Sequence, residues 1–423
     1  MRKRVIVVGA GAAGLMAAGR AAELGADVLL IEKMREAGNK ILVSGKERCN
    51  LSNAAPIEKF LAHYGPQGQF LRNAYYRFFR EELLALLARY GVETQVERGG
   101  RIFPAAGEAT EVRNALVRYA TQHGTEIRYL AEVHRLWVEG EVVKGVRLWS
   151  GEQLPADAVI VTTGGASWQA TGSTGDGYRM AQEVGHTVAP LRPALVPLTV
   201  ENRAQAKELQ GVSLRNSRCT FYAKKPEGKL KELRLPYPMP STGEMLFTHF
   251  GVSGPMILTA SLGVVDALRA GKEVILSIDL KPGMTNDQVQ TRLQREFEHF
   301  SQRHLRRLLK GWAPTGLAEV LARLSGIDAS RPIHTIRAEE RARIARLLKD
   351  FRWQITGSLP LESGMVTAGG VALKEINPMT FASRKIEGLY FAGEVLDLAA
   401  DTGGFNLQAA FSGGYLAGQD AAS

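Results

Sequence analysis

The chain contains 423 residues with a formal net charge of +10, and 45% of them are hydrophobic. This length and composition argue against a disordered protein and allow two or three globular domains with substantial cores. The only cysteines, Cys49 and Cys219, argue against a disulfide framework and favour a reducing compartment. We therefore expect a cytoplasmic protein with no signal peptide, and no uncharged apolar stretch is long enough for a membrane helix.

A strand, a glycine-rich turn and a helix are predicted at the start of the chain. The apolar run 5–8 leads into Gly9, Gly11 and Gly14, and a second apolar run at 28–31 ends at Glu32. Gly9 permits the turn, Gly11 lets a pyrophosphate approach the backbone, and Gly14 lets the helix lie close to the strand. Glu32 has the spacing of a carboxylate that binds ribose hydroxyls and repels a 2′-phosphate. The pattern predicts a dinucleotide and favours FAD or NAD over NADP.

Helices and short strands are predicted to alternate after this unit. A loop rich in glycine, serine and asparagine is expected over 38–53, before helical stretches at 70–90 and 109–123. Short alternating runs at 127–130, 133–139 and 142–149 are spaced like a β-meander. The run 158–163 then ends in Gly164 and Gly165, as a buried parallel strand of the nucleotide-binding sheet would.

The sequence changes character near Pro193 and Pro197, which mark a boundary. Alternating β-type runs follow to about residue 280, and over 285–350 the apolar period becomes helical, with no β-type runs. Short glycine-punctuated segments resume after Gly364. We predict a nucleotide-binding domain formed by 1–193 and 355–423, a β-type insert at 194–284 to which part of 350–365 can belong, and a helical subdomain at 285–354.

The positive charge is concentrated in the predicted insert. Between Arg215 and Arg234 there are seven basic and two acidic residues, and 286–350 holds 13 basic and eight acidic ones. These two segments account for the whole excess of +10. They are consistent with a polyanionic partner such as RNA, or with a solvated basic face that keeps the protein soluble.

A segment near the end of the sequence, 388–408, indicates that the dinucleotide is FAD. Two-dinucleotide-binding flavoproteins place a Gly-acid pair at the end of a late strand, against the ribityl chain and pyrophosphate, and then a helix N-terminus at the isoalloxazine carbonyl. Gly393 and Glu394, followed by 403–408 at the start of an alanine-rich helix, fit this order. Backbone N–H groups there would stabilise negative charge on the reduced flavin. We therefore predict FAD, bound non-covalently, because no His or Cys lies in a recognised flavinylation context.

Longer motifs lie at 38–53, 163–167, 172–178, 246–255, 367–371 and 388–408. They resemble those of the BaiN/YhiN-like flavoproteins, which include aminoacetone-oxidase-type members, and 38–53 is similar to the family loop GRKxxxSGxGRCNxTN. The resemblance implies an α/β fold in which a Rossmann-like two-dinucleotide-binding FAD domain is interrupted by a β-barrel-like domain and a helical subdomain. The sequence departs from the family at Asn39, commonly Arg, and at Lys46 and Glu47, commonly glycine, so the flexibility of this loop can differ.

The fingerprints and the resemblance together give an expected cofactor site, and no metal site is expected. The expected FAD-binding residues are Gly9, Gly11, Ala12, Ala13, Gly14, Glu32, Lys33, Asn39, Lys40, Ser44, Gly45, Arg48, Cys49, Asn50, Val133, Thr163, Gly164, Gly165, Gly393, Glu394, Asn406 and Leu407.

Three residues are candidates for catalysis, each with a structural alternative. Arg48 can hold a substrate oxygen or pair with an FAD phosphate. Cys49 can donate a proton, although a small buried thiol packed against FAD is the preferred interpretation. His249 can do the same, although a hydrogen-bonded structural histidine is preferred.

The resemblance implies two chemistries: reduction of conjugated C=C bonds with NAD(P)H, in steroid-type enones or a uracil of ribosomal RNA, and oxidation of small amines. No second Gly-x-Gly-x-x-Gly follows a strand, so NAD(P)H would dock transiently as electron donor. The basic insert favours a reductase acting on an RNA base. An aminoacetone-type oxidase and a small-enone reductase are the alternatives, and an RNA-binding protein with structural FAD is a third.

Overall fold

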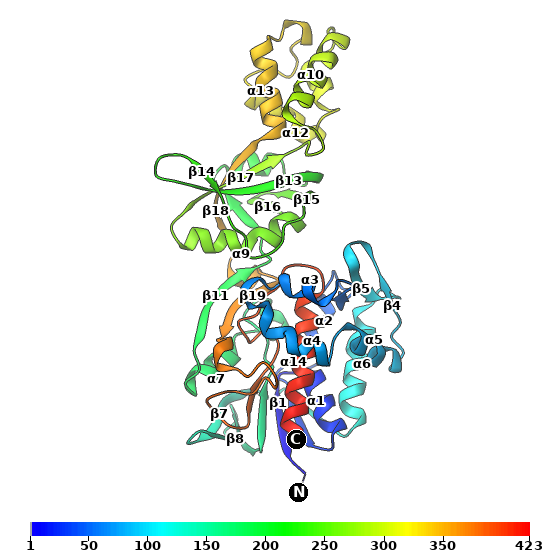
Figure 1. The fold of residues 1–423 in the computed structure, drawn as a ribbon, viewed down its shortest axis with the longest axis vertical. Coiled ribbons are helices and arrows are strands. Elements are labelled where there is room, and N and C mark those ends of the chain that lie inside the picture. Colours follow the sequence, from blue (N-terminus) through cyan, green and yellow to red (C-terminus); the bar gives the residue numbers. More distant parts are fainter. Residues whose placement is uncertain (1) are drawn as a thin grey trace. The chain divides into compact units, whose positions relative to one another are not determined.

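The computed structural model describes residues 2–423 and divides into two compact units. Unit 1 contains the residues up to Ala194 together with Pro360–Ser423, and unit 2 is Leu195–Leu359. The chain therefore leaves unit 1 after the first 194 residues and returns to it for the last 64 (Figure 1).

Unit 1 is built on a five-stranded parallel sheet in the order β20-β10-β1-β2-β6. The strands β1, β2, β10 and β20 are short and almost wholly buried, as expected for a parallel sheet covered on both faces, whereas the edge strand β6 is partly exposed. The sheet strands are β1 (Arg4–Val8), β2 (Asp27–Ile31), β6 (Glu126–Arg128), β10 (Ala158–Val161) and β20 (Leu389–Phe391). The first run of the predicted β-meander, 127–130, thus joins this sheet in parallel beside β2, and the prediction of a β-meander that includes it is wrong.

Small antiparallel sheets surround the parallel one. They are formed by β3 (Ser52–Asn53), β4 (Thr94–Val96) and β5 (Arg101–Pro104); by β7 (Val133–Glu139), β8 (Val142–Leu148) and β9 (Gln153–Pro155); and by β11 (Val188–Ala194) with β19 (Val366–Val371). The helices of unit 1 are α1 (Ala12–Glu23), α2 (Asn39–Val43), α3 (Ile57–Ala62), α4 (Arg72–Arg77), α5 (Arg80–Arg89), α6 (Ala109–Gln122), α7 (Asp176–Glu183) and α14 (Phe405–Ala422).

The first and last helices of the chain, α1 and α14, pack side by side (Figure 1). A Cβ on Gly414 would lie 2.2 Å from Ala13 O, and one on Gly418 would lie 2.2 Å from Ala17 O. Only glycine permits this approach, because any side chain would collide with the backbone of α1. The two helices are therefore held in one fixed register.

Unit 2 combines a closed antiparallel sheet with helices. The strand order is β14-β13-β15-β16-β12-β18-β17, and an additional pairing of β13 with β17 closes the sheet into a barrel. The strands are β12 (Leu198–Val200), β13 (Ser213–Lys224), β14 (Leu230–Glu232), β15 (Gly243–Thr248), β16 (Gly251–Ser253), β17 (Glu273–Asp279) and β18 (Phe351–Ser358). No strand between Leu195 and Leu359 pairs with the parallel sheet of unit 1.

The helices of unit 2 are α8 (Arg203–Glu208), α9 (Pro255–Arg269), α10 (Asn286–His299), α11 (Leu305–Leu309), α12 (Thr315–Leu324) and α13 (Ala338–Lys349). The last four occupy the predicted helical segment. The helices α8 and α9 interrupt the stretch that was predicted to be β-type, so that prediction is wrong there. The helix α9 is buried on nearly all sides, so it has no polar face whose period would have revealed a helix.

Candidate functional site

Three glycines shape the turn between β1 and α1. Gly9 has φ +100°, which other residues rarely adopt, and a Cβ on Gly14 would lie 1.8 Å from Gly9 O. Gly11 differs, because its φ of −80° suits any residue and a Cβ there would meet no atom within 4 Å. The chain itself thus gives no reason for glycine at position 11. A ligand gives such a reason. No side chain caps the N-terminus of α1, and a phosphate bound there would need the space that glycine leaves at position 11.

Glu32 follows β2 and is held beside this turn. Its Oε2 accepts a hydrogen bond from Ala10 N at 2.8 Å, and its Oε1 accepts one from Met34 N at 2.8 Å. Both bonds orient the carboxylate at the C-terminal end of the sheet, where ribose recognition requires it. The adjacent Lys33 is engaged by the protein, because its Nζ pairs with Asp176 Oδ2 at 2.5 Å.

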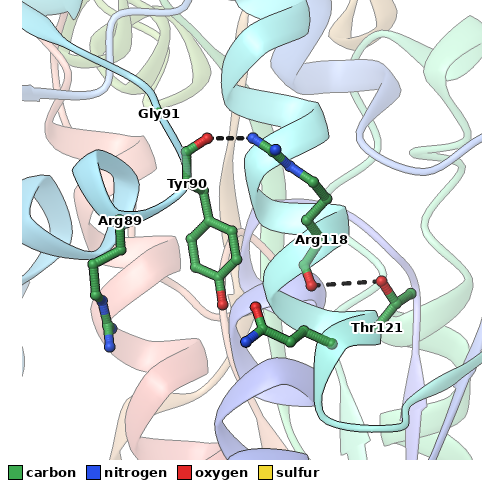
Figure 2. Close-up of a pocket in the computed structure, with 6 residues that line it drawn as sticks. Arg89, Tyr90, Gly91, Arg118 and Thr121 are labelled. Carbon is green, nitrogen blue, oxygen red and sulfur yellow. Dashed lines mark hydrogen bonds between the residues drawn. The ribbon is translucent and has the colours of Figure 1, made fainter.

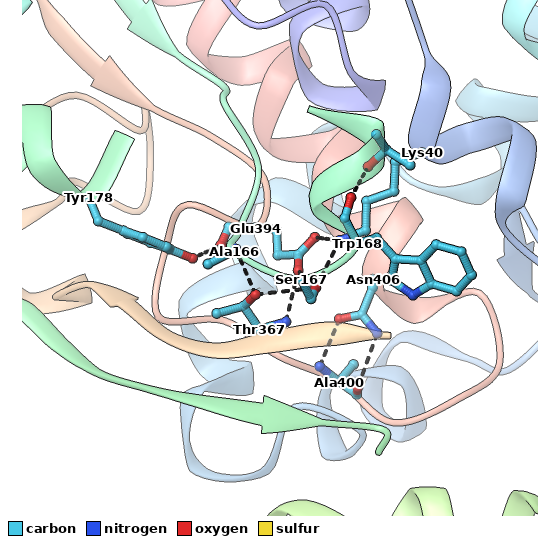
Figure 3. A network of polar contacts seen from close by, with 10 residues as sticks. Lys40, Ala166, Ser167, Trp168, Tyr178, Thr367, Glu394, Ala400 and Asn406 are labelled. Carbon is cyan, nitrogen blue, oxygen red and sulfur yellow. Dashed lines mark hydrogen bonds and ion pairs between the residues drawn. The ribbon is translucent and has the colours of Figure 1, made fainter. Parts of the chain in front are cut away.

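Glu394, just beyond β20, joins four segments of the chain (Figure 3). Its Oε2 pairs with Lys40 Nζ at 2.6 Å, and its Oε1 accepts hydrogen bonds from Thr367 N at 2.8 Å and Ser167 Oγ at 3.2 Å. Tyr178 OH donates to Glu394 O at 3.1 Å. Lys40 and Glu394 were expected at the site, whereas Ser167, Thr367 and Tyr178 were missed. Their signal was present, since all three lie in the motifs at 163–167, 172–178 and 367–371.

The N-terminus of α14 is open. No side chain caps it, and the N–H groups of Phe405, Asn406 and Leu407 have no acceptor among residues 2–423. With its amide oriented to satisfy its neighbours, Asn50 accepts from Gly404 N at 3.0 Å. The side chain of Asn406 bonds Ala400 N at 2.9 Å and Ala400 O at 3.0 Å (Figure 3). Asn406 thus shapes the loop, and the backbone N–H groups are what remains for a ligand.

The loop of Arg48 and Cys49 is tightly held. Arg48 forms a bidentate pair with Glu97 at 3.0 and 2.8 Å and lies over the Phe103 ring, with its guanidinium carbon 4.1 Å from the ring centroid. Cys49 is completely buried, and burial raises the pKa of its thiol to about 12 despite an opposing hydrogen bond with Ser44. A buried thiol with this pKa is a very weak acid, which favours the packing role over proton donation.

The other expected residues have mainly local roles. Asn39 Nδ2 donates to Glu36 O at 3.1 Å, Ser44 Oγ donates to Ile41 O at 2.7 Å, and Val133 is buried at the start of β7. The remaining expected residues lie in segments next to the parallel sheet. Ala12 and Ala13 begin α1, and Gly164 and Gly165 follow β10. Gly45 lies next to Asn50, and Gly393 lies opposite Ala13.

Thr163 contributes an unpaired group to the same edge, because its Oγ1 is buried and has no hydrogen-bond partner among residues 2–423. His249 lies in unit 2. It is exposed in the turn between β15 and β16 of unit 2, where its ring contacts Phe250.

The sequence of the chain matches a known protein family over nearly its whole length. A family model described as the HI0933-like protein Rossmann domain covers residues 3–420. The chain belongs to this family. It is 32% identical over 425 residues to the 3-dehydro-bile acid delta(4,6)-reductase of Clostridium scindens, covering 99% of each chain. It is also 31% identical over 418 residues to the ribosomal RNA dihydrouridine synthase of Haemophilus influenzae, covering 97% of this chain and 96% of the relative.

A solved structure shows the same fold across its whole length. The 3-ketosteroid-delta4-(5alpha)-dehydrogenase of Rhodococcus jostii has a TM-score of 0.54 at 15% identity, with both chains fully covered. The family and its relatives confirm the predicted fold class. The protein is an FAD-dependent oxidoreductase with a Rossmann-type FAD-binding α/β fold.

The residues of this HI0933-like chain fit FAD. The space at Gly11 and the uncapped N-terminus of α1 suit a pyrophosphate, and the fixed carboxylate of Glu32 suits a ribose. The open N-terminus of α14 suits an electron-rich ring carbonyl. Within residues 2–423, no group of His, Cys, Asp and Glu side chains could hold a metal ion. No helix in that range combines the length and apolarity needed to span a bilayer.

Two polar residues at the start of α14 were missed by sequence reasoning. His63 Nδ1 lies 2.7 Å from Asp401 Oδ1, although 338 positions separate them. Asp401 is buried, and this burial raises the pKa of its carboxyl group while the contact with His63 opposes the shift. No local motif marks either residue, so only the fold brings them together.

Unit 1 contains a hollow of about 600 Å³ whose lining includes none of the expected cofactor residues (Figure 2). It lies at the C-terminal ends of α5 and α6 and is lined by Arg89, Tyr90, Gly91, Arg118, Thr121 and Gln122. The opposite end of α6 meets the loop that contains Arg48 and Cys49, where Ala109 N donates to Glu47 O at 3.1 Å. Because α6 is about 20 Å long, this hollow is not part of the site described above.

Proposed function

We propose that the protein uses NAD(P)H to reduce a conjugated C=C bond. The proposal rests on the chain-long similarity to two relatives whose names both denote reduction of a C=C bond conjugated to a carbonyl, one in a bile acid and one in a uracil. Bound FAD supplies hydride transfer through its N5 atom. The chain's own contribution is the open N-terminus of α14, whose backbone N–H groups stabilise negative charge.

Anaerobic stopped-flow mixing of the purified yellow protein tests this reaction. NADH or NADPH should bleach the flavin, and a conjugated acceptor should restore its colour in the absence of oxygen. Bleaching by aminoacetone, followed by rapid reoxidation in air, would instead support an amine oxidase. Failure of both nicotinamides to reduce the flavin would contradict the proposal.

An RNA base is the proposed substrate, because unit 2 carries 26 basic and 16 acidic residues and unit 1 is neutral. Several of these cations surround the β13–β14 hairpin. Lys224 pairs with Glu273, whereas Arg215, Lys229, Lys231 and Arg234 have no carboxylate in ion-pair distance among residues 2–423. Unpaired cations can neutralise phosphates without first breaking an internal ion pair.

Salt-dependent binding of a ribosomal RNA fragment tests the substrate. On a log–log plot the affinity should fall linearly with salt, and Lys229→Glu/Lys231→Glu should flatten the slope by about 1–2 because about 0.7–0.9 ion is released per phosphate contact. Arg2→Glu/Lys3→Glu is the control, with the same charge change on exposed residues of unit 1. Equal binding by both variants, or no binding by the parent at low salt, would exclude RNA.

A small enone is the second candidate, favoured by the 32% identity to the bile-acid reductase over 99% of both chains. Reoxidation of the reduced protein by 4-androstene-3,17-dione, with no response to RNA, would select this substrate class.

A further inference from the structure

His63 and Asp401 form a coupled pair at the start of α14. The imidazole Nδ1 lies 2.7 Å from Asp401 Oδ1, and Asp401 N donates to His63 O at 3.3 Å. The carboxylate is almost wholly buried, whereas the imidazole is 24% exposed. One ring nitrogen is therefore tied to a buried acid, and the ring also reaches the surface of unit 1.

The orientation of the imidazole is fixed by stacking. Its ring lies 3.9 Å from the Phe405 ring, centroid to centroid, at an interplanar angle of 14°. Phe405 is itself buried, and its backbone oxygen accepts a hydrogen bond from Tyr64 OH at 2.5 Å. His63 Nε2 has no hydrogen-bond partner among residues 2–423. The structure thus holds the ring rigidly and leaves one nitrogen available.

The pair borders the helix end that is expected to face the flavin. Asn406 Nδ2, in the first turn of α14, lies 3.3 Å from Asp401 O, and Asn53 Nδ2 donates to Gly403 O at 3.1 Å. His63 comes directly after α3, which lies near this end of α14 (Figure 1). Imidazole with one nitrogen on a carboxylate and the other free is the usual arrangement of a histidine that transfers protons.

We infer that His63 donates the proton to the α-carbon of the substrate's C=C bond and that Asp401 positions it. The inference rests on the proposed reductase function. As the β-carbon accepts the hydride, the Nε2–H bond of the imidazolium breaks and a C–H bond forms at the α-carbon. His63 keeps its Nδ1 proton toward Asp401 and regains the other from water. The product has gained two hydrogens, and NAD(P)H supplies the two electrons.

A structural role for the pair is the alternative, and His63→Asn separates the two. The asparagine amide can still donate to Asp401 from near the position of Nδ1, but it has no counterpart of Nε2. A structural pair would therefore survive this substitution, whereas a proton donor would not.

Four measurements on the holoenzyme test the assignment. In His63→Asn, FAD content and anaerobic flavin reduction by NAD(P)H should stay within about twofold of the parent. Reoxidation by 4-androstene-3,17-dione or by a uridine-containing ribosomal RNA fragment should slow by about 10²–10⁴-fold, the usual contribution of a general acid. Reoxidation by ferricyanide should be unchanged, because that acceptor takes electrons without protonation of carbon.

A spectroscopic readout tests Asp401 without turnover. In ¹⁵N-histidine NMR of the parent, the neutral imidazole of His63 should carry its proton on Nδ1, and the His63→Asn spectrum identifies the signal. Asp401→Asn should reduce this tautomer preference and slow reoxidation by the same substrate about tenfold. An unchanged tautomer in Asp401→Asn would exclude the positioning role.

The outcomes separate this inference from the proposed function. Substrate reoxidation of His63→Asn at the parental rate overturns the proton assignment and leaves the reductase in place. Loss of FAD, or equal slowing with ferricyanide, shows a structural role and also overturns it. A parent protein that is reduced by NAD(P)H but reacts with neither conjugated probe overturns both.

Discussion

The two units differ in how they use charge. Unit 1 has 27 basic and 27 acidic residues, and the acids at its sheet edge are bonded within the unit, as Glu32 is to backbone N–H groups and Glu394 to Lys40. Unit 2 carries the whole excess of +10, and several cations of its β13–β14 hairpin have no carboxylate in ion-pair distance among residues 2–423. In unit 1 charge fixes the geometry of a site, whereas in unit 2 it is available to an outside partner.

The largest expected effect comes from comparing Gly14, which the fold requires, with Gly11, which only the ligand is expected to require. Gly14→Ala places a Cβ 1.8 Å from Gly9 O, so the turn must deform, and the free energy of unfolding should fall by about 3 kcal/mol or more. Gly11→Ala meets no atom of the chain and should leave the FAD-free protein as stable as the parent while weakening FAD binding. Urea unfolding with and without FAD measures both. If Gly11→Ala and Gly14→Ala destabilised the FAD-free protein equally, the claim that the ligand requires glycine at position 11 would be contradicted.

A smaller effect is expected at the fixed carboxylate of unit 1. Glu32→Ala should weaken FAD binding by about 1–3 kcal/mol, the range of charge-assisted hydrogen bonds. Flavin released on dilution, followed by fluorescence, gives the dissociation constant. Glu36→Ala is a matched control, because Glu36 is an exposed acid four residues away that pairs with Arg113. If the two variants retained FAD equally, the ribose contact of Glu32 would be excluded.

Acid should weaken both units through one buried carboxylate each. Burial alone would raise the pKa of Glu375 in unit 1, but hydrogen bonds from Thr187 and Lys385 lower it to about 2. In unit 2, Arg331 lowers the pKa of Glu340 to about 2. Both folded values lie below the ordinary 4.5. The stabilisation by each ion is therefore complete above about pH 4.5 and is lost as the pH falls toward 2.

The acid effect is measured with Glu375→Gln and Glu340→Gln. Each variant should be less stable than the parent in urea at pH 7, and the difference should shrink near pH 3. A difference that stays constant between these pH values would show that the carboxylates do not titrate as proposed.

The smallest effect is expected in the loop before Cys49. Lys46 has φ +59°, although only glycine adopts this region without cost. Lys46→Gly should relieve about 1–2 kcal/mol of strain and lose about 0.5–1 kcal/mol through greater freedom of the unfolded chain. A net gain of up to about 1 kcal/mol in thermal unfolding is expected, and Lys59→Gly in helix α3 should instead destabilise. If Lys46→Gly lost stability, the claim that the backbone is strained at Lys46 would be contradicted.

The sequence predicted the structure correctly where the pattern depends on local spacing, as in the unit formed by β1, α1 and β2. Gly9, Gly11, Gly14 and Glu32 belong to one βαβ unit, so their distances along the chain determine their positions in space. The helix α9 was missed because it is apolar on nearly all sides, so it has no helical period. His63 and Asp401 are 338 positions apart, and only the packing of α3 and α14 brings them together.

The glycine contacts of α14 have a consequence for the length of the cofactor. Gly414 and Gly418 lock α14 onto α1, so the two helix N-termini at the sheet edge cannot slide past each other. The distance between the two helix N-termini is therefore fixed, and it would match only a cofactor whose pyrophosphate and ring carbonyl are that far apart. FMN, which ends at a single phosphate, is too short to place a ribose against Glu32, so it should bind more weakly than FAD.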